Sequence, residues 1–250
     1  MNKVEYLILK SALQCPENII NVANDYKIPN FEVVRAANSL FQNGYILAEI
    51  VNDEENIKEN LLSKVQSNED SLPENFLGKG INNYNEKPLR PIFKAEKPAI
   101  LTLTQIEASL SRESGILYYL TPKGGFHWET ITHPDWSHFA SIIFSNTESE
   151  EIDLEEVICP SKQFIEKYLS IDCYVSPVIH VPGTEVWDVL SPWQATYWKT
   201  LPRGYRVRFQ CVHNNWYIDS DTTPEWIEAN DQANEWYWEF RQWYTNPEFE

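Results

Sequence analysis

The sequence lacks the features typical of exported proteins, membrane-spanning proteins and proteins with a structural metal site. Its few cysteines are far apart in the chain and form no C-x-x-C pair, so we expect buried thiols and neither disulfides nor a zinc knuckle. They are Cys15, Cys159, Cys173 and Cys211. No run approaches the roughly 18 apolar residues of a membrane span, and charged residues at 3, 5 and 10 interrupt the first apolar stretch. We therefore expect a cytoplasmic protein without membrane contact.

Basic residues are also scarce. The chain has 20 Lys and Arg against 37 Asp and Glu, a net charge of -17. Residues 1–133 carry 13 basic and 17 acidic residues, a net of -4, whereas residues 134–250 carry 7 and 20, a net of -13. All ten tryptophans lie at or after Trp128. These shifts place a domain boundary near 134–150. The acidity favours a basic partner over nucleic acid, with solubility alone as the alternative explanation.

Catalytic and cofactor motifs are missing as well. No G-x-S-x-G motif occurs, and Lys123-Gly124-Gly125 lacks the spacing of a phosphate-binding loop, so we expect no cofactor. Imidazole and carboxylate groups do cluster just beyond it, and these groups bind divalent metals. The cluster contains His127, Glu129, His133, Asp135 and His138. Surface histidines at a domain junction are the favoured interpretation. An enzyme with a site at this junction remains an alternative.

Hydrophobic periodicity predicts three short helices in the first part of the chain, over 3–14, 17–26 and 31–42. Asn30 is expected to cap the third helix and Gly44 to end it, before a strand over 45–51. Residues 52–98 are polar and broken by prolines, typical of a long insertion or mobile loop with one short helix around 56–66. A helix over 101–114, capped by Thr102 or Thr104, and a strand over 115–120 follow. Thr121 and Pro122 then begin another helix.

Two stretches carry a family resemblance. Val33 to Gly44-Tyr45-Ile46, and Tyr119-Leu120-Thr121-Pro122-Lys123-Gly124, together resemble the recognition helix, wing strands and closing helix of winged-helix domains of the MarR and PadR kind. The resemblance covers residues 3–133, with the wing interrupted by an insertion over about 52–100. It implies a DNA-binding transcriptional regulator with a C-terminal sensing or assembly domain. The implied DNA-binding residues are Arg35, Asn38, Gln42 and Lys123.

The second half is predicted to be an acidic, Trp-rich α+β domain with a small sheet, so the whole chain is α+β. Strands are expected over 155–161, 174–181 and 204–212, the last with clear alternation of apolar and polar residues. Helices are expected over 161–171, over 184–201 with a break near Ser191-Pro192, and over 223–244 with Thr222 or Thr223 as its cap. The last helix carries more aromatic residues than one apolar side can hold.

The leading hypothesis is a non-enzymatic protein-binding module with a basic protein partner, in the manner of an immunity or inhibitor protein. Surplus tryptophans are favoured at protein interfaces, and the acidic run over residues 148–156 attracts basic partners. The predicted partner-binding residues are Trp236, Trp238, Trp243, Glu150, Glu151 and Asp153. Burial of most tryptophans in the core is the competing interpretation.

Overall fold

The structure, a computed structural model, describes residues 1–50, 99–110, 116–145, 153–176, 178–213 and 223–249. It mixes helices with small sheets, as the predicted α+β class requires. None of the described helices has the length and apolar character of a membrane span. The first half contains, in order, α1 (Lys3–Ser11), β1 (Glu17–Asn18), α2 (Ile19–Asp25), α3 (Asn30–Gln42), β2 (Ile46–Ile50), α5 (Leu103–Leu110), β3 (Ile116–Leu120) and α6 (Pro122–Thr132).

Helices pack against a three-stranded antiparallel sheet in the first half, with the strand order β1-β3-β2. Strands β2 and β3 pair from Ile46 opposite Leu120 to Ile50 opposite Ile116. The predicted helix stop is confirmed, because Gly44 adopts a φ of +68°, which glycine tolerates best. The predicted Asn30 cap is wrong. Helix α3 begins at Asn30, and Pro29 takes the cap position without a side-chain hydrogen bond.

The helix expected over 17–26 begins only at Ile19, because Glu17 and Asn18 form β1 and pair with β3. Two other predicted helix starts in this half are confirmed. The Thr121 side chain accepts a hydrogen bond from the Gly124 amide, with Pro122 at the first helical turn. Thr102 and Gln105 exchange hydrogen bonds at the start of α5. The insertion over 52–98 and its short helix lie outside the described residues.

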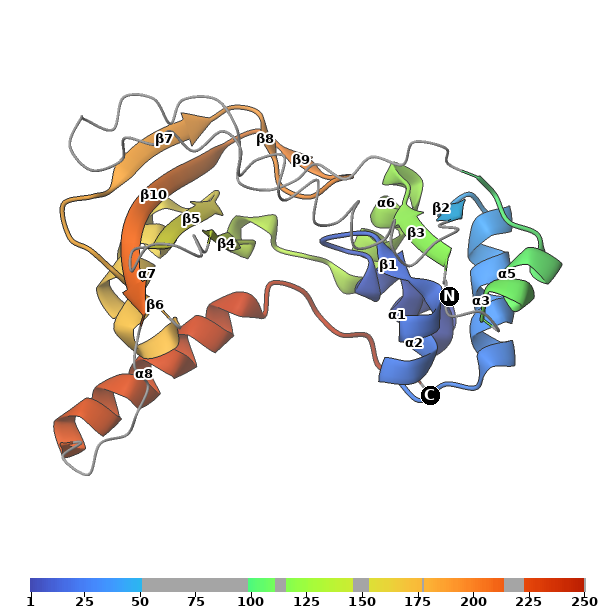
Figure 1. The fold of residues 1–250 in the computed structure, drawn as a ribbon, viewed down its shortest axis with the longest axis horizontal. Helices are drawn as coiled ribbons and strands as arrows, with labels where there is room; N and C mark the ends of the chain where they lie inside the picture. Colours follow the sequence, from blue (N-terminus) through green and yellow to red (C-terminus); the bar gives the residue numbers. More distant parts are fainter. Residues whose placement is uncertain (51–98, 111–115, 146–152, 177, 214–222, 250) are drawn as a thin grey trace.

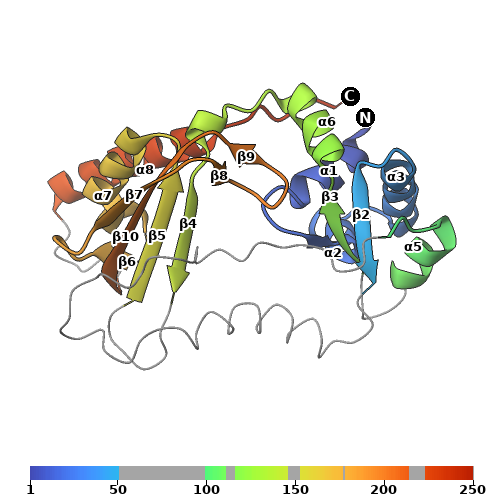
Figure 2. The ribbon, with the colours of Figure 1, turned by 90° about the horizontal axis from the view of Figure 1, so that it is seen from above.

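The second half is built on a second antiparallel sheet, with the strand order β4-β5-β10-β6 and β7 also paired with β10. Helices α7 and α8 pack together on one side of it (Figures 1 and 2). The remaining elements are a short 3-10 turn (Trp136–His138), β4 (Ser141–Ser145), β5 (Asp153–Cys159), α7 (Lys162–Val175), β6 (Val178–His180), β7 (Val186–Leu190), β8 (Trp193–Gln194), β9 (Thr200–Leu201), β10 (Gly204–His213) and α8 (Pro224–Arg241).

Two predictions in this half are wrong. The segment 184–201, expected to be helical, forms the strands β7, β8 and β9. Its Val-Trp-Asp-Val run suits a pleated strand, and β7 pairs with β10 so that Asp188 lies opposite Arg206. The strand expected over 174–181 shortens to β6, because helix α7 continues to Val175.

A hydrophobic core joins the two halves. Residues of the second half, among them Phe139, Trp193 and Trp243, belong to the same buried cluster as the helices of the first half. The chain after α8 crosses back to the first half (Figure 1), where the Thr245 amide donates to the Thr132 carbonyl at 2.9 Å. The predicted boundary near 134 is thus spanned by packed side chains and by the C-terminal segment.

Two adjacent glycines of α6 permit close approaches of neighbouring segments. A Cβ atom on Gly124 would lie 2.0 Å from the Tyr45 carbonyl oxygen, and one on Gly125 would lie 2.1 Å from the Trp198 ring. Trp198 is held in place by a 3.0 Å hydrogen bond from its indole to the Leu13 carbonyl. Both glycines therefore have a packing role: Gly124 lets α6 approach Tyr45 within the first half, and Gly125 lets α6 approach Trp198 of the second half.

Candidate partner-binding surface

Helix α8 carries the residues that the sequence favoured for partner binding. Its start is well defined, because the Thr223 side chain accepts a hydrogen bond from the Trp226 amide and Pro224 occupies the first turn. Glu225 in the first turn and Arg241 in the last both complement the helix dipole. All 18 residues of the helix are described, and Ala233 alone is buried. Such a helix leaves most of its surface to solvent.

One side of α8 packs on α7 through aromatic rings. The Phe240 ring stacks on Phe164 with 3.7 Å between centroids, and Trp236 stacks on the same ring at 5.3 Å. Tyr237 lies 6.2 Å from the Tyr168 ring. Trp236 is half-buried by these contacts, so its predicted role as a partner anchor gives way to one in holding α8.

The opposite side of α8 presents a row of carboxylates. The row contains five acidic side chains. All five are exposed, and none forms an ion pair with a described residue. Five acidic residues against Arg241 leave the helix with a net charge of -4. At 100° and 1.5 Å per residue they fall within about a third of the helix circumference and extend over about 21 Å. The row consists of Glu225, Glu228, Asp231, Glu235 and Glu239.

Exposed apolar side chains border this row. Trp238 is 60% exposed and Ile227 is 50% exposed. They lie 11 positions apart, which corresponds to about 16 Å along the helix axis. Trp226 is 39% exposed, with its ring 5.7 Å from that of Tyr174 on α7. Acidic and aromatic groups that share one solvent-facing side are suited to a cationic, partly apolar partner.

The other predicted partner residues lie elsewhere. Trp243 is 8% exposed and packs in the core between the halves, 4.8 Å from the Trp136 ring and 5.6 Å from that of Trp128. Its predicted role at an interface is therefore wrong. Glu150 and Glu151 lie outside the described residues. Asp153 opens β5 opposite Cys211, and its side chain is not described.

The predicted DNA-binding residues lie on or beside α3, but they do not form one cationic surface. Arg35 and Gln42 are exposed and Asn38 is half-buried. The Lys123 ammonium donates to the Asn43 carbonyl at 2.7 Å, beyond the end of α3. This contact occupies a cation that the resemblance assigned to DNA.

The predicted metal ligands are dispersed. His127 stacks on Tyr45 at 4.4 Å, and burial lowers its pKa. The Glu129 carboxylate accepts hydrogen bonds from the Trp136 indole and from the Lys199 ammonium. His133 ends α6 in a left-handed conformation, whereas His138 lies 3.9 Å from Asp135 and packs near Phe240. Within the described part of the chain, no three His, Cys, Asp or Glu residues form a group that could hold a metal ion.

Sequence patterns did not indicate the buried acids of the second sheet. Glu155 and Glu156 are neighbours on β5, both fully buried, and their side chains alternate between the two faces of the sheet. Glu156 pairs with the Arg208 guanidinium at 2.7 Å. Glu155 accepts a 2.8 Å hydrogen bond from the Tyr168 hydroxyl, and burial raises its pKa to about 8. The sequence does not show that Glu155 is protonated and Glu156 ion-paired, because both lie in the same acidic run.

An imidazole between two carboxylates completes this region. The His180 Nδ1 atom lies 2.8 Å from Asp172, and Nε2 lies 3.5 Å from Glu185. The Asp172 carboxylate also accepts from the His180 amide at 2.7 Å. This arrangement links β6 to α7. The two carboxylates contact different nitrogens of the imidazole ring, so the three groups do not converge on a common ligand position.

No protein family, characterised protein or solved structure matches this chain. The assignment of function therefore depends on the chain's own residues.

Proposed function

We propose that the chain is a non-enzymatic protein-binding module that docks a basic protein on the solvent-facing side of α8. One observation carries the proposal: the exposed side chains Trp238 and Ile227 border a row of five carboxylates without ion-pair partners in the described chain. An inhibitor or immunity protein that covers a cationic surface of its partner would need such a side. The net charge of -17 of the whole chain also favours a basic partner.

The two kinds of side chain would contribute differently. Carboxylates attract a cationic partner over distances of about 8 Å at physiological ionic strength and mainly accelerate association. Trp238 would supply the anchor, because tryptophan is among the residues whose truncation costs the most at interfaces, about 2 kcal/mol or more. Affinity should therefore fall with added salt but not vanish while Trp238 is intact.

The experiment compares four immobilised forms of the full chain in capture from lysate, followed by rebinding of each purified captured protein. The forms are wild type, Trp238→Ala, the triple variant Glu228→Gln, Asp231→Asn, Glu235→Gln, and the control Phe126→Ala. Phe126 lies on α6 and is 65% exposed, which matches Trp238 away from α8. We expect a basic protein that rebinds wild type and the control with equal affinity, Trp238→Ala about 30-fold more weakly, and the triple variant with reduced salt dependence.

Two results would contradict the proposal. One is a captured protein whose affinity is the same for wild type and both α8 variants. The other is capture of nucleic acid with no protein that rebinds.

We also propose that residues 1–133 form a winged-helix domain, with DNA binding as the second candidate function. The order of α1, β1, α2, α3, β2 and β3 supports it, as does the antiparallel sheet that places β3 between β1 and β2. Gel shifts at low salt test the DNA function. Arg35→Ala should abolish retardation of a duplex, whereas Lys123→Ala should have a small effect because Lys123 already binds the Asn43 carbonyl. Absence of retardation for wild type on any duplex would exclude it.

A further inference from the structure

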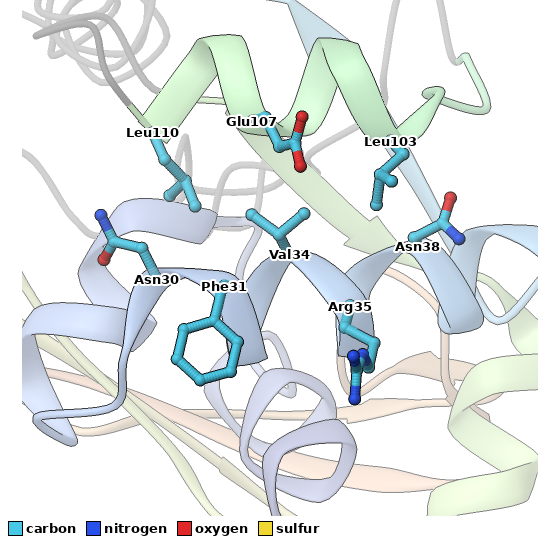
Figure 3. A pocket seen from close by; sticks show the side chains of 8 residues that line it. All are labelled: Asn30, Phe31, Val34, Arg35, Asn38, Leu103, Glu107 and Leu110. Atoms are coloured by element: carbon cyan, nitrogen blue, oxygen red, sulfur yellow. The ribbon is translucent and has the colours of Figure 1, made fainter.

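A groove lies between α3 and α5 (Figure 3). These two helices are at the end of the molecule distant from α8 (Figure 1). The groove has a volume of about 550 Å³, within the range of about 300–1,000 Å³ typical of binding pockets. Its apolar floor includes Val34 and Leu110, both buried, and Leu103, which is 45% exposed. The remaining lining residues are Asn30, Phe31, Arg35, Asn38 and Glu107.

An aromatic side chain stands beside this groove. In Figure 3, Val34 points toward α5, whereas Phe31 and Arg35 project from the adjacent side of α3. The Phe31 ring is 66% exposed, an unusual position for a phenylalanine unless another surface covers it. The same part of the molecule therefore carries both a projecting ring and an apolar depression.

The groove also carries one uncompensated charge of each sign. Arg35 comes from α3 and Glu107 from α5, and neither forms an ion pair or a side-chain hydrogen bond with a described residue. The charges of the lining residues sum to zero, in contrast with the net charge of -17 of the whole chain. Two copies of so acidic a protein repel each other over most of their surface, and this groove, whose lining residues carry no net charge, is a place where they can meet.

We propose that the α3–α5 surface binds a second copy of this chain. In a two-fold contact each surface meets its own copy, so residue i contacts residue j of the partner and the reverse. Phe31 of each copy then enters the groove of the other, and Arg35 of each copy faces Glu107 of the other. A projecting ring, a groove and an opposite-charge pair on one surface are the elements that such a self-complementary contact requires.

Sedimentation equilibrium of the full chain at increasing concentration tests the proposal. We expect the mass of wild type to rise reversibly from 29.3 kDa toward twice that value. Phe31→Ala should weaken dimerisation about tenfold or more, and Arg35→Glu and Glu107→Arg should each do so by repulsion. The double variant Arg35→Glu, Glu107→Arg restores opposite charges across the contact and should recover most of the affinity.

Phe126→Ala is the matched control, because Phe126 is 65% exposed on α6 and should leave the dimer unchanged. All five variants change exposed or groove-lining side chains, and circular dichroism checks that each is folded. A wild type that stays monomeric at several hundred micromolar would overturn the proposal. The proposal would also be overturned if the double variant dimerised as weakly as the effects of its two single changes added together predict. That holds even if the groove then bound another protein or DNA.

Discussion

Replacement of Glu155 by glutamine tests the interior of the second half through its dependence on pH. Glu155 is fully buried on β5. Burial is the largest cause that raises its pKa from 4.5 to about 8, and the nearby carboxylate of Asp172 adds to it. The Tyr168 hydroxyl donates to Oε1, while Oε2 has no hydrogen-bond partner in the described chain. The folded protein therefore holds a proton on this carboxyl at neutral pH.

The sign of the effect follows from proton linkage. Because the folded pKa exceeds the unfolded one, Glu155 costs no stability below pH 4.5 and an increasing amount as the pH rises toward 8. Each pH unit in that interval costs about 1.4 kcal/mol, so the cost reaches about 3 kcal/mol at pH 7. Glutamine has the same shape but no titration, and its amide oxygen can still accept from Tyr168.

Urea unfolding at pH 4.5, 5.5, 6.5 and 7.5 measures the difference in unfolding free energy between Glu155→Gln and wild type. Any cost of the buried amide itself is independent of pH, so the change in this difference with pH isolates the carboxyl. We expect the variant to gain about 3 kcal/mol relative to wild type between pH 4.5 and 7. A difference that stays constant over this range would refute the reasoning.

Glu156→Gln is the matched control for this experiment. Glu156 is equally buried and adjacent, but its carboxylate pairs with Arg208 at 2.7 Å. Its replacement removes this charge pair from a buried position and should destabilise the protein by about 3–5 kcal/mol at pH 7. Opposite signs at neutral pH for two neighbouring glutamates would show that the surroundings and not the residue type determine the effect.

Two further substitutions test the joint between the halves, both read by thermal and urea unfolding. Gly125→Ala places a methyl group 2.1 Å from the hydrogen-bonded Trp198 ring and should cost about 1–3 kcal/mol, so an unchanged midpoint would contradict the packing role. Trp243→Ala opens a cavity in the shared core and should cost about 3–5 kcal/mol. The exposed Trp238→Ala should stay within about 0.5 kcal/mol of wild type, and equal losses for the two tryptophans would contradict their assigned positions.

Prediction from the sequence succeeded where a local signal determines the structure. The Thr121-Pro122 helix start and the Gly44 stop each depend on one residue's own chemistry, and both are confirmed. The 204–212 alternation likewise predicted β10, because a strand with one apolar face has an unmistakable period of two. These signals require no knowledge of the rest of the chain.

Prediction failed where a distant partner decides the structure. The aromatic residues of 184–201 match either a helix or a strand, and pairing with β10 selects the strand. Trp238 and Trp243 are tryptophans only five positions apart. Trp243 alone of the two is in the core, because the chain returns to the first half after α8. The protonated state of Glu155 likewise depends on its burial opposite α7, which no spacing of acidic residues indicates.

The two proposed surfaces are far enough apart to be tested separately. In both views α8 lies at one end of the molecule and α3 and α5 lie at the other (Figures 1 and 2). A dimer through α3 and α5 would therefore leave both α8 helices open, and the complete assembly would hold two copies of the chain and two of the basic partner. Trp238→Ala should then abolish partner binding while the sedimentation mass stays dimeric, and Phe31→Ala should do the reverse. A Trp238→Ala protein that loses the dimer would show that the two surfaces are coupled and would contradict their independence.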